Sequence, residues 1–119
     1  MSLATTGPRG LQVESVALED IAARFGTPCY VYSRAALTAA YVAYRDALKA
    51  RGLLDRSLIC YAIKANSNLA ILKLFADLGA GFDIVSSGEL ARVLTAGGSA
   101  DRIVFSGVGK AREEMRAAL

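Results

Sequence analysis

The sequence alternates short apolar segments with amphipathic ones, and this alternation restricts the possible folds more than any other feature. Apolar segments lie at 57–64, 81–85 and 102–105. Each is followed, directly or after a loop, by a segment with the pattern of an amphipathic helix. The segments recur roughly every 20–25 residues, as successive βα units do. The pattern therefore predicts an α/β fold with parallel strands.

Helix signals lie between the predicted strands. Leucine, phenylalanine and alanine recur at helical spacing in 68–78, and Gly79 follows that segment directly. A second helix is predicted over 89–96, before Gly97, and a last helix from about Ala111. We expect each helix to cover the sheet formed by the strands.

The N-terminal third has a different pattern. It predicts a helix over 15–25, a strand over 29–32 and a long helix over 34–51, with Ser33 as the N-cap.

Composition excludes several classes of protein. The 119 residues are 54% hydrophobic and carry a net charge of +3 from scattered basic residues, which suits a globular domain better than a nucleic-acid-binding surface. No apolar run approaches the roughly 18 residues of a membrane span. The beginning lacks the features of a secretory signal. We expect a cytoplasmic protein in which Cys29 and Cys60 are reduced.

The sequence contains no histidine. Nucleophilic catalysis of the Ser–His or Cys–His type therefore cannot occur within these residues, and a histidine-based metal site is excluded. We expect no metal site in this chain.

Lys64 is the leading candidate for chemistry. It ends the apolar run 58–63, and parallel sheets and barrels place their reactive groups at the carboxyl ends of their strands. A lysine amine can form a Schiff base with an aldehyde. Ala62 and Ala65 leave room for a flat ring beside it. The alternative is an ordinary surface charge.

Asp83 is a second candidate because it interrupts an apolar strand. A carboxylate in such a strand is costly unless it has a partner. Phe82 and Ile84 make the other strand face apolar, so Asp83 is expected on the opposite face. It could be a counter-charge for Lys64 or a structural partner for an amide or an arginine. Glu89 is expected to form a capping box with Ser86.

Four segments resemble diaminopimelate decarboxylases, a family of pyridoxal-phosphate enzymes with an alanine-racemase-like barrel. They are TPCYVYS at 27–33, YAIKANSN at 61–68, GFDIVSSGEL at 81–90 and IVFSGVGK at 103–110. The resemblance extends from about residue 12 to the end of the chain, in the order of the family. It implies the first part of a pyridoxal-phosphate-binding (β/α)8 barrel.

The resemblance also implies an activity. The family converts meso-2,6-diaminopimelate to L-lysine and CO₂ in lysine biosynthesis, with pyridoxal 5'-phosphate as cofactor. By resemblance, Lys64 forms the Schiff base with the cofactor, Asp83 gives electrostatic support, and Ala62 lies beside the cofactor. The small-molecule substrate would be diaminopimelate, and the protein would be a homodimer without a nucleic-acid or membrane partner.

Further expectations concern the parent protein. Residues 1–33 would associate with a C-terminal β domain, and 34–119 would form an incomplete barrel. The phosphate loop and other site residues of the family would lie beyond residue 119, so we expect this portion alone to be inactive. Two alternatives stay open: a related decarboxylase of another diamino acid or polyamine precursor, and a non-catalytic protein that binds pyridoxal phosphate.

Overall fold

A computed structural model describes residues 3–119, with residues 1–2 outside the described part. The chain divides into two compact units, Met1–Ala40 and Tyr41–Leu119. Each unit is considered by itself. The boundary expected after residue 33 stays a prediction.

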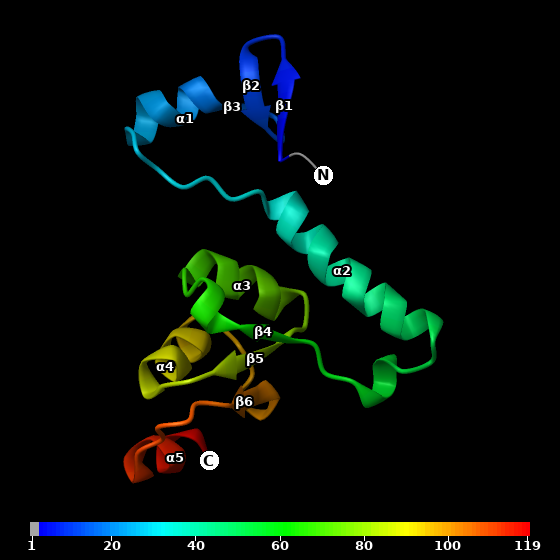
Figure 1. Ribbon diagram of the computed structural model, residues 1–119, viewed down its shortest axis with the longest axis vertical. Helices are drawn as coiled ribbons and strands as arrows, with labels where there is room; N and C mark the ends of the chain where they lie inside the picture. Colours follow the sequence, from blue (N-terminus) through cyan, green and yellow to red (C-terminus); the bar gives the residue numbers. More distant parts are fainter. Residues whose placement is uncertain (1–2) are drawn as a thin grey trace. The chain divides into compact units, whose positions relative to one another are not determined.

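The N-terminal unit is built on a small antiparallel sheet (Figure 1). Strands β1 (Ala4–Gly7), β2 (Gly10–Val13) and β3 (Val16–Ala17) pair in that order, and helix α1 (Leu18–Phe25) follows. The predicted helix over 15–25 therefore begins three residues late. Its first residues pair with β2 instead, because their backbone groups find strand partners there.

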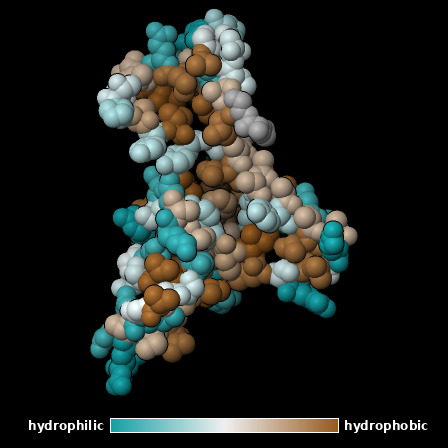
Figure 2. Space-filling view, viewed as in Figure 1, coloured by the Kyte–Doolittle hydropathy of each residue, from teal (hydrophilic) through white to brown (hydrophobic). Residues whose placement is uncertain are grey.

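The strand predicted over 29–32 is wrong for this structure. Those residues carry no strand or helix assignment, and Tyr30 is 89% exposed. A strand exists only when a neighbouring strand completes its hydrogen bonds, and the described residues provide none for this segment. Figure 2 shows hydrophobic surface on the N-terminal unit, where Leu11 and Phe25 are exposed.

Helix α2 (Arg34–Ala50) begins where the sequence predicts. The Ser33 hydroxyl accepts a hydrogen bond from the Ala36 N–H at 3.0 Å, which confirms its role as N-cap. The carboxylate of Glu14, in the turn before β3, accepts the Ser33 hydroxyl at 2.7 Å and the Ala35 N–H at 2.8 Å. This carboxylate therefore joins the small sheet to the first turn of α2.

Replacing Glu14 with glutamine should lower stability at neutral pH but not at low pH. Hydrogen bonds from the Ala35 amide and the Ser33 hydroxyl hold the pKa of Glu14 below its ordinary value of 4.5. Its stabilisation is therefore present above that value and is lost as the pH falls through the lower pKa of the folded state. Urea unfolding midpoints measured across the acid range should converge for the two proteins.

Asp55→Asn is the matched control, because Asp55 is an exposed carboxylate on the short 3₁₀ helix η1 (Leu54–Arg56). If the urea unfolding midpoints of Glu14→Gln and the unsubstituted protein differed by the same amount at every pH, the role assigned to Glu14 would be contradicted.

The C-terminal unit contains the predicted parallel sheet (Figure 1). Strands β4 (Cys60–Ala62), β5 (Gly81–Ile84) and β6 (Ile103–Phe105) lie in that order, with β5 in the centre. In the register, Ala62 pairs with Asp83 and Asp83 pairs with Val104. The fold class predicted from the sequence is confirmed.

Three helices follow the strands: α3 (Leu69–Asp77), α4 (Ser87–Thr95) and α5 (Arg112–Ala118). Asn68 caps α3, since its side chain accepts the Ala70 N–H at 2.9 Å. Gly79 and Gly97 follow α3 and α4 with φ of 83° and 86°, a left-handed conformation that glycine adopts without strain.

One face of the parallel sheet forms the core. Phe82 and Ile84 of β5 are completely buried. Helix α3 packs on this face through Phe75, whose ring stacks on that of Tyr61 with centroids 4.4 Å apart. Burying a side chain such as Phe82 contributes about 1.5–3 kcal/mol, so this face accounts for much of the unit's stability.

Two further findings concern general properties of the chain. Cys29 and Cys60 are both free thiols in this structure. Within residues 3–119, no helix has both the length and the apolar character that a membrane span requires.

Candidate active site

Lys64 lies just beyond the end of β4. The strand predicted over 57–64 is shorter in the structure, and Lys64 belongs to a 3₁₀ turn, η2 (Ile63–Ala65). Only Cys60–Ala62 pair with β5, so the chain is free to turn once these pairs end. Ile63 is completely buried and anchors the turn, whereas Lys64 is exposed. Lys64 thus keeps its predicted place at the carboxyl end of the strand.

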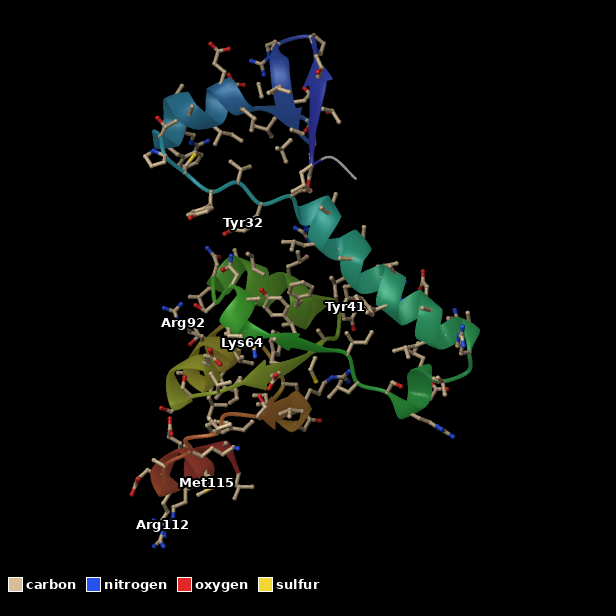
Figure 3. All side chains as sticks on the ribbon, viewed as in Figure 1. Tyr32, Tyr41, Lys64, Arg92, Arg112 and Met115 are labelled. Atoms are coloured by element: carbon tan, nitrogen blue, oxygen red, sulfur yellow. The ribbon has the colours of Figure 1, made fainter. Side chains whose placement is uncertain are left out.

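The loop after Lys64 is held by side chains from β4, from α4 and from the loop itself. The Tyr61 hydroxyl donates to the Asn66 carbonyl at 3.1 Å, and the Asn66 side chain accepts the Asn68 N–H at 2.9 Å. Arg92 of α4 donates to the Ser67 carbonyl at 3.2 Å. Figure 3 shows Lys64 and Arg92 at the same end of the C-terminal unit.

Asp83 lies on the sheet face opposite the core, as predicted. It occupies the central strand between Ala62 and Val104, while its neighbours Phe82 and Ile84 point into the core. Its Oδ1 atom is buried and accepts no hydrogen bond from any residue of 3–119. In the described part of the chain, Asp83 and Lys64 form no ion pair, and the role of Asp83 as a counter-charge stays a prediction.

Cys60 lies on the same face as Asp83. Its Sγ lies against Gly81, where an added Cβ would come within 2.9 Å of the sulfur. Burial raises the pKa of the Cys60 thiol, and the charge of Asp83 raises it further. The thiol is therefore disfavoured as a thiolate nucleophile at neutral pH.

Two glutamates organise the loops after β5 and β6. The Ser86 hydroxyl accepts the Glu89 N–H at 3.3 Å, as the capping box predicts, but the Glu89 carboxylate accepts the Val85 N–H at 2.7 Å. The Glu114 carboxylate accepts the Ala111 N–H at 3.0 Å and the Ser87 N–H at 3.1 Å. These amides lower the pKa of Glu114 and join the two loops.

Comparison with known proteins shows the family of this chain. The family model described as "Pyridoxal-dependent decarboxylase, pyridoxal binding domain" matches residues 36–119, which include Lys64 and Asp83. The chain belongs to the pyridoxal-dependent decarboxylase family. Its cofactor is therefore pyridoxal phosphate.

Individual relatives agree with the family. The chain is 63% identical over 109 residues to a diaminopimelate decarboxylase of Pseudomonas fluorescens, covering 92% of this chain and 25% of the relative. The crystal structure of M. jannaschii diaminopimelate decarboxylase with L-lysine matches with a TM-score of 0.88 and 32% identity. That match covers 98% of this chain and 27% of the other.

A more distant match is the lysine decarboxylase of Selenomonas ruminantium, with a TM-score of 0.72 and 30% identity over 85% of this chain and 25% of the other. The chain spans about a quarter of the length of the curated relatives that it matches. The architecture is thus the first part of the pyridoxal-binding barrel of this decarboxylase family.

The residues of this pyridoxal-dependent decarboxylase chain suit its cofactor. A lysine amine joins an aldehyde directly, and Lys64 is accessible. The buried Oδ1 of Asp83 has no partner, and leaving such an atom unsatisfied is costly, which suits a site completed by another group. Ala62 adds only a methyl group beside Asp83.

Sequence patterns did not reveal the side chains that hold the loops. Tyr61, Arg92 and Glu114 all bond to backbone atoms of a loop. No periodicity identifies these contacts, because Arg92 and Glu114 reach partners 25 and 27 residues away.

Gly107→Ala should disturb the loops at the carboxyl end of the sheet. A Cβ at Gly107 would lie 2.6 Å from the Val85 carbonyl oxygen, so the loop after β6 would have to move away from β5. Such overpacking costs about 1–3 kcal/mol. Urea unfolding of the full-length protein that contains this chain would measure the loss.

Gly109→Ala is the matched control, because nothing lies within 4 Å of a Cβ built there. Equal stability losses in the two variants would show that the close approach at Gly107 is not the cause.

Proposed function

We propose that the protein containing this chain decarboxylates meso-2,6-diaminopimelate to L-lysine and CO₂. The observation that carries the proposal is Lys64 at the carboxyl end of β4, on a chain 63% identical over 109 residues to a diaminopimelate decarboxylase. The chain represents a quarter of the relative's length, so the activity is proposed for the whole protein.

Within the proposed site, each residue has its own role. Lys64 would hold pyridoxal phosphate through its amine, and once released it is placed to move a proton at Nζ. Asp83 would support the site electrostatically through its unpartnered, buried Oδ1. Ala62, beside Asp83 in the register, would leave space for the flat ring.

When bound, pyridoxal phosphate supplies an electron sink for the electrons of the bond that breaks as CO₂ leaves. The contribution of this chain is to place a lysine amine and a carboxylate near that sink. The sheet supports both, since rigid elements hold reactive groups more accurately than free loops do.

Assembly and location follow the same proposal. We propose a cytoplasmic homodimer, in which residues 1–33 associate with a β domain elsewhere in the protein. The exposed Tyr30 and the absence of a strand at 29–32 support the association with a β domain, because an extended segment can pair with a strand supplied from elsewhere.

Covalent trapping would test the role of Lys64. Adding pyridoxal phosphate to the full-length protein should give an imine absorption band, and borohydride should fix the label on the peptide that contains Lys64. Lys64→Arg keeps the charge but should abolish both signals, since its guanidinium is a poor nucleophile. Peptide mass spectrometry would locate the label.

Lys73→Arg is the matched control, because Lys73 is an exposed lysine on α3. A label on any lysine other than Lys64 would refute the assignment.

A second candidate function is the decarboxylation of another diamino acid, such as lysine. The match to the Selenomonas ruminantium lysine decarboxylase favours it, but at 30% identity against 63% for the diaminopimelate decarboxylase of Pseudomonas fluorescens.

Release of CO₂ from several substrates would decide between the two functions. We expect kcat/KM for meso-diaminopimelate to exceed that for L-lysine or L-ornithine by about a hundredfold or more, because a polar site rejects analogues that leave its groups unpaired. A preference for lysine or ornithine would favour the second candidate. No release from any of them, with Lys64 still labelled, would indicate a non-catalytic pyridoxal-phosphate protein.

A further inference from the structure

Tyr61 connects the core to the turn that carries Lys64. Its ring stacks on Phe75 of α3 with a centroid distance of 4.4 Å and an interplanar angle of 20°. Its hydroxyl donates to the Asn66 carbonyl at 3.1 Å, five residues further along the chain. The side chain therefore closes a loop of backbone, and Lys64 lies inside that loop.

The rest of the turn is held at neighbouring points. Ile63, directly before Lys64, is completely buried. Beyond Lys64, Asn66 accepts the Asn68 N–H through its side chain, and Arg92 donates to the Ser67 carbonyl at 3.2 Å. The turn is thus held by the buried Ile63 before Lys64 and by hydrogen bonds after it, while the Lys64 side chain remains exposed.

We propose that the Tyr61 hydroxyl is a positioning group for the Lys64 amine, with Arg92 as a second, weaker support. The inference rests on the proposed function, because it concerns how Lys64 is presented to the cofactor. A lysine amine ends a flexible four-carbon stem, so the backbone of the turn determines which space the amine can reach. Holding that backbone reduces the number of unproductive positions.

Tyr61→Phe isolates the hydroxyl, because the phenylalanine ring retains the stacking surface against Phe75. Tyr44→Phe is the matched control: Tyr44 is 70% exposed on α2 and loses the same atom far from the turn in sequence. Arg92→Met is the second variant, since methionine keeps a straight side chain at an exposed helical position and removes the guanidinium donor together with its charge.

The experiment uses the full-length apoprotein and pyridoxal phosphate as the probe. The rate of imine formation is followed by absorbance, and borohydride with peptide mass spectrometry confirms the attachment at Lys64. Amide hydrogen exchange of residues 63–68 is measured without cofactor, so that this readout is independent of activity. Thermal unfolding of each variant monitors the fold.

We expect Tyr61→Phe to form the imine about tenfold more slowly and to exchange the amides of 63–68 faster, because a misplaced group reacts slowly. Arg92→Met should show the same two changes to a smaller extent, and Tyr44→Phe should show neither. If Tyr61→Phe unfolds at the assay temperature, the rate of imine formation in Arg92→Met decides whether the inference holds.

Imine formation at the parent rate in both Tyr61→Phe and Arg92→Met would overturn the inference. Faster amide exchange in 63–68 without slower imine formation would also overturn it, because the hydrogen bond of the Tyr61 hydroxyl would then stabilise the fold without positioning the amine. Failure of the proposed function looks different: the unsubstituted protein would carry no label at Lys64, or it would carry the label and release no CO₂ from meso-diaminopimelate.

Discussion

The parallel pairing of β4 with β5 is the constraint on which the site depends. This register places Tyr61 beside Phe82 on the face covered by helices, and it places Ala62 beside Asp83 on the other face. A shift by one residue would exchange the faces, burying the carboxylate in the core and exposing Phe82. The burial of Phe82 therefore indirectly fixes where the site lies, because the energy of the core selects the register.

The same pairing explains the difference between the two candidate residues. Asp83 lies within the central strand, where two neighbours hold its backbone. Lys64 lies in the turn that follows the last paired residue of β4, so the position of its backbone depends on side-chain contacts to the loop. The strand fixes the carboxylate, whereas Tyr61, Asn66 and Arg92 restrict the segment that carries the amine. The Lys64 side chain extends from that segment toward solvent.

Much of the C-terminal unit could be predicted from the sequence, because each βα unit has a local signal. Apolar strands, the caps at Asn68 and Ser86, and the glycines after α3 and α4 all act within a few residues. The N-terminal unit was harder to predict. Its hairpin of β1 and β2 is short and partly polar, and the segment 29–32 requires a strand partner that no local pattern supplies.

Within the site, the sequence identified the reactive residue types but not the contacts that place them. The positions of Lys64 and Asp83 followed from strand ends and strand faces. The sequence left open whether Asp83 is a counter-charge for Lys64, and within residues 3–119 the two side chains form no ion pair. The bonds of Arg92 and Glu114 depend on the packing of distant helices.

A crystal structure of the full-length protein with pyridoxal phosphate would show directly whether Lys64 and Asp83 form the cofactor site. We expect continuous electron density from the Lys64 Nζ to the cofactor, with the cofactor on the sheet face that carries Asp83 and with the Asp83 Oδ1 bonded to a partner. Density joining the cofactor to another lysine, or a cofactor bound on the face of Phe82 and Ile84, would contradict it.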